Sequence, residues 1–390
     1  MRDAWCLFKS TTSRRDVRGC SGTARSSVGE EVTLSRRQMF GQLVAMAGAG
    51  AVTGLGACAR LVTGECADLA GARIRWVVQN APGSTYDAET RLLEPYLERR
   101  LGAEIIIDNQ AGAGGITGAR AIASARPDGR TLGTIGVPGL LVATMLGNTD
   151  VPDPSRDFTV LGRISRSWHV WAAGQKSPLR SIDDVIARSA TRRVAFAINE
   201  AGSASLVGIA ETAALLGIGV DLVAGFTGTR SACLAAIRGD VDMVCFNYDT
   251  IRDLIASGDL LPLLQVSTAP IAPDQVLKGV PILGGARGLA VGRASARGTD
   301  VERARAAANA LIHVIGSGRI VVAPAHLPPA IAECLSSALY ATLTSAELGP
   351  AGRDFDAATG PAAAAEVQAA ALGAPQLVPA VREAMRALRQ

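Results

Sequence analysis

The sequence is poor in the side chains that most often do chemistry in proteins. Only 4% of its residues are aromatic, and the only three histidines among its 390 residues are His169, His313 and His326. The histidines lie far apart in sequence, and none has a nearby cysteine at the spacing of a zinc site. The sequence therefore predicts no metal site, and a core built from Ala, Val, Leu and Ile.

Complete nucleotide and nucleophile motifs are missing as well. No Gly-x-Ser-x-Gly elbow surrounds Ser203 or Ser205, and no P-loop occurs. Gly112-x-Gly114 begins like a dinucleotide-binding loop, but Thr117 stands where its third glycine belongs, and no acidic residue ends the following strand. We therefore expect no cofactor and no catalytic residue. The alternative is an enzyme or a nucleotide-binding protein on a doubly wound α/β fold.

The excess of positive over negative charge lies at the start of the chain. Residues 1–58 carry 8 Lys and Arg against 4 Asp and Glu, whereas the remainder carries 31 of each. A neutral body offers no electrostatic surface for nucleic acid or for an anionic membrane. We expect no nucleic-acid partner, and membrane contact only through an anchor near the N-terminus.

Residues 35–58 resemble an export signal. Arg36 and Arg37 precede a short apolar stretch rich in Gly and Ala, as in twin-arginine signals. The stretch ends at Leu55-Gly56-Ala57-Cys58, which resembles a lipobox with Cys58 as the lipidated residue. A plainly cleaved signal or an uncleaved anchor is the alternative. Residues 1–34 are polar and unpatterned, and are interpreted as a disordered extension or the product of a misplaced start codon.

Two of the seven cysteines stand in apolar runs, Cys233 in SACLAAI and Cys245 in VDMVCF. Buried free thiols are the preferred interpretation, although an oxidising compartment would permit a disulfide.

Strand-like runs alternate with helical spacing after residue 72. Strands are expected at residues 73–79, 104–108, 130–135, 168–173, 194–198, 220–224, 241–246, 260–266 and 319–323. Helices are expected at residues 92–101, 116–125, 181–189, 206–216, 230–238, 250–257, 301–315, 328–344 and 361–389. Residues 286–299, rich in Gly and Arg, are interpreted as a surface loop. This alternation predicts parallel, doubly wound α/β sheets.

Three loops of small residues, the first at 82–87, the second at 109–116 and the third at 201–205, each follow an expected strand and precede an expected helix, where open α/β sheets bind ligands. A helix start has unpaired N–H groups and a partial positive charge, so such a loop can bind an anion without Lys or Arg. Capping and turn chemistry is the better explanation of any single loop, but three such loops in one chain favour a ligand site. Asp87 could accept a hydrogen bond from the ligand or simply complement the helix dipole. The candidate ligand-binding residues are Pro82, Gly83, Ser84, Thr85, Asp87, Asn109, Gly112, Ala113, Gly114, Gly115, Gly202, Ser203, Ala204, Ser205 and Asp249.

These motifs resemble the tripartite tricarboxylate transporter receptors, also called Bug or TctC-like proteins. The family pattern P-G-G-x-x-D-x-x-A-R is similar to residues 82–91, N-x-x-G-A-G-G to residues 109–115, and P-D-G-x-T-L to residues 127–132. Gly202-Ser203 and residues 239–242 resemble two further family segments. Ser84, Leu206 and Phe226 depart from the pattern, where Gly, His and Tyr are usual.

The resemblance implies a periplasmic-binding-protein type II-like α/β fold with a ligand cleft between two doubly wound domains. Domain 1 would comprise residues 73–170 and 320–390, and domain 2 residues 171–319. The implied function is an extracytoplasmic, periplasmic or cell-surface receptor for a small carboxylate. Its implied partners are the membrane subunits of a secondary transporter, with sensing as the other role. The sensing domain of a transcription regulator can share this fold, but the export signal and the lack of a helix-turn-helix segment disfavour it.

Overall fold

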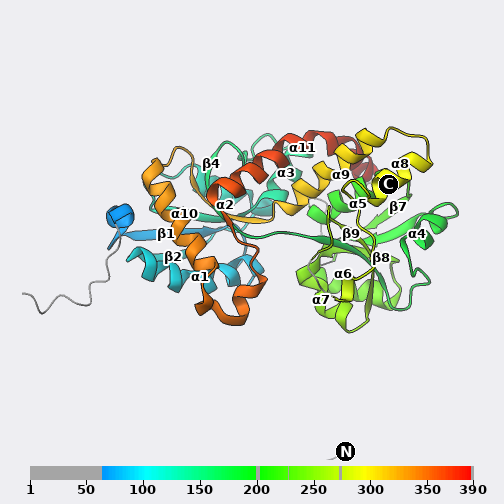
Figure 1. Cartoon of the computed structure of the whole chain (residues 1–390), viewed down its shortest axis with the longest axis horizontal. Helices are drawn as coiled ribbons and strands as arrows, with labels where there is room; N and C mark the ends of the chain where they lie inside the picture. The colour runs from blue at the N-terminus through cyan, green and yellow to red at the C-terminus, as the bar shows by residue number, and fades with distance from the viewer. Residues whose placement is uncertain (1–63, 199–202, 227, 272–274, 388–390) are drawn as a thin grey trace, which may run out of the picture. The chain divides into compact units, whose positions relative to one another are not determined.

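The computed structural model describes residues 64–198, 203–226, 228–271 and 275–387 (Figure 1). The export signal, including Arg36, Arg37 and Cys58, and Gly202 of the third loop lie outside the described residues. In the part of the chain that is described, no helix is both long and apolar enough to span a membrane.

The first sheet has six strands in the order β11-β4-β10-β3-β1-β2. Strand β1 is parallel to β2 and β3, whereas β10 is antiparallel to β3 and β4. The strands are β1 (Arg73–Val78), β2 (Glu104–Asn109), β3 (Thr131–Gly136), β4 (Phe158–Ser165), β10 (Arg319–Pro324) and β11 (Ala358–Thr359).

The second sheet has five strands in the order β7-β6-β8-β5-β9. Strand β6 is parallel to β7 and β8, and β5 is antiparallel to β8 and β9. The strands are β5 (His169–Gly174), β6 (Val194–Ala197), β7 (Val220–Val223), β8 (Met243–Asn247) and β9 (Leu260–Val266).

The sheets are mixed and not parallel throughout as expected, because β10 and β5 run antiparallel to their neighbours. Both are continuously buried runs, and such a run looks the same in sequence whichever way it points. The two-sheet α/β architecture itself is confirmed. The chain passes from the first sheet to the second between β4 and β5 and returns at β10. The boundaries of domains 1 and 2 stay a prediction.

The helices that follow the strands bury their apolar faces. The longest, α11, packs against α3, α5, α9 and β4 (Figure 1). The helices are α1 (Thr85–Leu101), α2 (Ile116–Ala123), α3 (Val137–Met145), α4 (Ile182–Ser189), α5 (Ala204–Leu216), α6 (Thr229–Arg238), α7 (Tyr248–Ala256), α8 (Leu289–Ala296), α9 (Val301–Gly316), α10 (Pro329–Leu343) and α11 (Gly360–Ala387). Short 3₁₀ turns are η1 (Gly64–Leu69), η2 (Ala113–Gly115), η3 (Gln275–Leu277) and η4 (Ala346–Asp354).

Neither α3 nor β4 was predicted from the sequence, and the surface loop expected at residues 286–299 is wrong. That segment contains α8, which buries Ala290 and Ala294, four residues apart on one helix face. Two alanines give a weak apolar signal, and the surrounding Gly and Arg residues hid it.

A disulfide joins Cys66 of η1 to Cys334 of α10, with a Cα–Cα distance of 5.5 Å. The sequence analysis did not foresee this pair. Cys233 and Cys245 are confirmed as buried free thiols. Burial raises the pKa of Cys233 to about 12. Both are therefore packing residues without reactive thiolate character.

Candidate functional site

The second and third loops line one cavity of about 750 Å³, which we call the glycine cavity. Its walls come from the ends of β1 and β3, the starts of α1, α2 and α5, the whole length of α3 with the turn after it, and Ser167 between β4 and β5. The residues that line it are Gln79, Asn80, Ala81, Tyr86, Ala111, Gly112, Ala113, Gly114, Gly115, Ile116, Gly136, Pro138, Gly139, Ala143, Leu146, Asn148, Ser167, Ser203 and Ala204. Of the candidate residues, the structure thus brings together Gly112, Ala113, Gly114 and Gly115 with Ser203 and Ala204.

Helix α2 begins without a side-chain cap at Gly115, after the short η2 turn. Glycine is required here for two reasons. The φ angles of Gly112, Gly114 and Gly115 are 140°, 67° and 95°, in the region that side chains disfavour. A Cβ at Gly115 would also lie 2.7 Å from Cδ of Gln79. The loop therefore presents bare backbone to the cavity.

Helix α3 supplies a second start without a side-chain cap, which the sequence analysis missed. The Val137 N–H donates to the Gly318 carbonyl oxygen at 3.2 Å, and Pro138 has no N–H. Gly139, which lines the cavity, is thus the first residue of this helix with an N–H left to offer. Gly136 before the helix and Pro138 inside its first turn are an ordinary helix-start signal that could have revealed it.

Helix α5 places the third loop at the same cavity. Ser203 caps the helix, with its Oγ accepting from the Leu206 N–H at 3.4 Å, and both Ser203 and Ala204 line the cavity. Ser205 is buried inside the helix and does not line it.

The structure places the first loop outside the cavity wall, apart from Tyr86, although Ala81 just before the loop lines the cavity. Pro82, Gly83, Ser84, Thr85 and Asp87 do not line it. The polar groups of this loop bond to one another and cap α1. Ser84 Oγ accepts from the Asp87 N–H at 3.3 Å, and the Gly83 N–H donates to Asp87 Oδ2 at 2.8 Å. These contacts match the capping interpretation of Asp87.

Asp87 is also paired, because Arg91 Nε donates to its Oδ1 at 3.0 Å. This hydrogen bond from Arg91 lowers the pKa of Asp87 below its usual value, so the carboxylate stays ionised. Arg91 Nη2 further donates to Asn109 Oδ1 at 3.3 Å, and Asn109 Nδ2 donates to the Asn80 carbonyl at 3.0 Å. Asn109 therefore clamps the ends of β1 and β2. Asp249, exposed in the first turn of α7, does not line the cavity.

No Asp, Glu, Lys, Arg or His is among the described residues that line the glycine cavity. A buried cation, Arg319, lies with its guanidinium carbon 5.4 Å from the centre of the Tyr86 ring, and Tyr86 lines the cavity. Arg319 Nη2 donates to Glu89 Oε1 at 2.6 Å, so its charge is largely offset by a partly buried carboxylate. The field in the cavity therefore comes mainly from helix starts and neutral amides.

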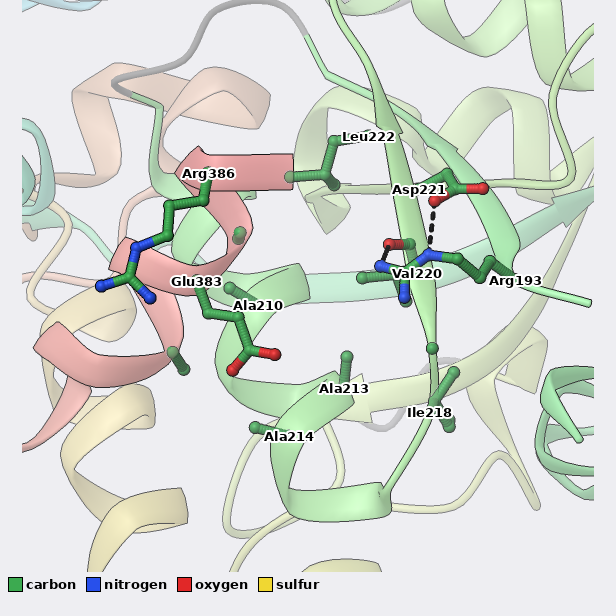
Figure 2. A pocket seen from close by; sticks show the side chains of 13 residues that line it. Arg193, Ala210, Ala213, Ala214, Ile218, Val220, Asp221, Leu222, Glu383 and Arg386 are labelled. Atoms are coloured by element: carbon green, nitrogen blue, oxygen red, sulfur yellow. Dashed lines mark hydrogen bonds and ion pairs between the residues drawn. The ribbon is translucent and has the colours of Figure 1, made fainter. Parts of the chain in front are cut away.

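A second cavity, of about 600 Å³, lies among α5, β7 and the end of α11 (Figure 2). Its floor is formed by Ala210, Ala213 and Ala214, and its rim carries the Arg193–Asp221 ion pair. Glu383 and Arg386 of α11 extend over the same space (Figure 2). It contains none of the candidate residues and no helix start, so we take the glycine cavity as the functional site.

Residues 90–272 match the model of the tripartite tricarboxylate transporter family receptor. Protein BugT of Bordetella pertussis is 27% identical over 216 residues, which cover 53% of this chain and 66% of BugT. The matched segments reach between 39% and 66% of the length of the first three curated relatives.

Two solved structures share the fold at low sequence identity. A TctC solute-binding protein from Polaromonas is 18% identical with a TM-score of 0.61, and the match covers 78% of this chain and 97% of that one. MatC from Rhodopseudomonas palustris, solved with bound malate, is 21% identical with a TM-score of 0.58, covering 78% and 99%. The fold is thus the type II periplasmic-binding-protein fold that the sequence predicts, and the family is one of receptors rather than enzymes. Over residues 90–272 the chain matches the TctC/Bug family of tripartite tricarboxylate transporter receptors.

Proposed function

We propose that this chain is an extracytoplasmic receptor that captures a small carboxylate in the glycine cavity. One observation carries the proposal: the starts of α2 and α3 lack side-chain caps and meet at a cavity whose described walls hold no charged side chain. A helix dipole stabilises an anion at such a place. The N–H groups of Gly115 and Ile116 already donate to the Gly112 and Ala113 carbonyls, so α2 acts through its dipole, whereas α3 adds the Gly139 N–H. The bound malate in MatC, which shares the fold, is of the chemical class proposed here.

The proposal also covers export, membrane anchoring and partner proteins. The chain would be exported by the twin-arginine route and held at the membrane by lipid on Cys58. Its partners would be the membrane subunits of a tripartite tricarboxylate-type transporter, or a sensing system. The Cys66–Cys334 disulfide supports an oxidising destination.

A thermal-shift screen tests the proposal. A ligand that binds only the folded protein, present at 100 times its Kd, should stabilise it by about 2.7 kcal/mol. The screen should include dicarboxylates, tricarboxylates, acidic amino acids and aromatic acids, with NAD and ATP as the arm for the alternative function. A shift with NAD or ATP and none with any acid would refute the receptor proposal.

The variant Gly114→Val tests whether the anion binds against the backbone of the glycine loop. Gly114 has a φ of 67° and its Cβ would enter open space, so valine would project a branched side chain from the cavity wall. Gly258→Val is the matched control, because Gly258 has a φ of 80°, equally open surroundings and no place in the cavity. Both variants carry the same backbone strain, and only Gly114→Val should abolish binding in calorimetry.

Two further variants compare how much a hydroxyl group and a surface cation contribute to the binding free energy. Ser203→Ala should cost about 1 kcal/mol of binding free energy, the scale of one hydrogen bond. Arg91→Met should leave the affinity within about threefold, because Arg91 pairs with Asp87 outside the cavity and a threefold change is under 1 kcal/mol. Loss of binding in Arg91→Met with retention in Gly114→Val would mean that a side-chain cation holds the anion.

A further inference from the structure

Two neighbouring amide side chains at the end of β1 line the glycine cavity with unsatisfied oxygens. Gln79 Oε1 and Asn80 Oδ1 are both buried and make no hydrogen bond to any described residue. Gln79 is only 5% exposed. Buried acceptors without a partner are rare in folded proteins and usually mark the place of a ligand or an ordered water. Sequence analysis had assigned neither residue a role.

The surrounding glycines leave room for the Gln79 amide. A Cβ at Gly115 would lie 2.8 Å from Gln79 Nε2, and one at Gly136 would lie 3.2 Å from the same atom. A Cβ at Gly118 would lie 2.7 Å from Gln79 Cα. These glycines come from α2 and from the end of β3, so two separate elements accommodate this one side chain. The amide is therefore packed into the wall and is not a mobile surface group.

The chemistry of the wall defines what would satisfy these oxygens. Both unsatisfied atoms are acceptors, so their missing partner is a donor such as a hydroxyl or an ammonium group. An ammonium group would find no carboxylate among the described residues of the cavity wall and would lose its hydration without a counter-charge. A hydroxyl carries no such penalty and needs only the acceptor that the wall supplies.

We propose that Gln79 and Asn80 determine specificity, by selecting acids that carry a hydroxyl group beside the carboxylate. The carboxylate faces the starts of α2 and α3, and the hydroxyl donates to an amide oxygen of the β1 end, directly or through one water. This inference rests on the proposed function and adds the ligand's second group to it. A site built to pair a hydroxyl discriminates strongly against the analogue that lacks it.

Pairs of acids that differ by a single hydroxyl test the proposal by calorimetry. Suitable pairs are malate and succinate, 2-hydroxyglutarate and glutarate, and citrate and tricarballylate. The protein should bind the hydroxy acid of at least one pair 10-fold or more tightly than its partner. Gln79→Met, which keeps the length of the side chain, and Asn80→Leu should each reduce this preference at least threefold. The affinity for the hydroxy acid should fall, and the affinity for the acid without the hydroxyl should stay unchanged.

Gln110→Met is the matched control. Gln110 follows the neighbouring strand β2, donates to Asp108 and does not line the cavity, so this variant should keep the full preference. Equal affinity for both acids of every pair that binds would overturn this inference and leave the proposed function standing. An unchanged preference in both Gln79→Met and Asn80→Leu would overturn it as well. If no acid of any pair binds and the wider acid screen is flat, the proposed function fails and the inference fails with it.

Discussion

The Cys66–Cys334 disulfide should contribute several kcal/mol to stability. It closes a loop across a sequence separation of 268 residues. Chain-entropy arithmetic for a loop of that length gives about 5–6 kcal/mol at 25 °C, and removal of natural disulfides typically costs about 2–5 kcal/mol. Residues 60–390 form one compact unit. With about 2.1 cal/mol/K of unfolding entropy per residue over roughly 330 residues, that cost corresponds to a fall in Tm of about 3–7 °C.

The assay is calorimetric melting of the Cys66→Ala/Cys334→Ala double variant. Alanine is chosen because Cys334 is buried and a serine hydroxyl there would lack a partner. Dithiothreitol should lower the Tm of the unmodified protein by the same amount and should not affect the double variant. An unchanged Tm in the double variant would refute the reasoning. It would mean that packing of buried Leu69 already fastens η1 to the fold.

The remaining predictions concern pH and export. Burial raises the pKa of Glu211 to about 7, with Arg303 opposing the shift, so the folded state holds this proton more tightly than the unfolded state. The free energy of unfolding should therefore fall by up to about 3 kcal/mol as pH rises from about 4.5 to about 7, and Glu211→Gln should remove that fall in urea titrations. Replacing Arg36 and Arg37 by Lys should leave the precursor in the cytoplasm on fractionation. Cys58→Ala should abolish labelling by a radioactive or clickable fatty acid, and persistent labelling would contradict the lipoprotein prediction.

Strand and helix positions could be predicted well where the signal was local. The glycines at residues 112–115 mark both the end of a strand and the start of a helix, and the structure places them at a cavity. Capping is equally local, and the structure places Ser84 and Asp87 in the capping roles that the sequence already offered for the first loop. What the sequence could not decide was whether that loop also lines the cavity.

The rest of the cavity depends on strand order, which no local pattern contains. Gln79 and Gly136 belong to segments almost sixty residues apart, and they meet because β1 pairs with β3. Arg319 reaches the back of Tyr86 because β10 pairs with β3, so that Arg319 stands opposite Gly136. Likewise, Cys66 meets Cys334 only because η1 packs on α10. None of these contacts can be predicted from the sequence until the order of the strands and the packing of the helices are known.

The pairing of Arg319 with Glu89 bears on how selective such a receptor can be. An unpaired arginine behind Tyr86 would raise the affinity for every anion alike, because a full charge acts over a longer range than a hydrogen bond. Because Glu89 pairs with Arg319 at 2.6 Å, the polar groups left along the described cavity wall are helix starts, glycine backbone, hydroxyl groups and three side-chain amides. Hydrogen bonds to neutral groups depend steeply on distance and angle, so they discriminate between acids of the same charge. Glu89→Gln should therefore raise the affinity for succinate more than for malate and reduce the preference between them, whereas an unchanged ratio in calorimetry would show that Arg319 does not act on the cavity.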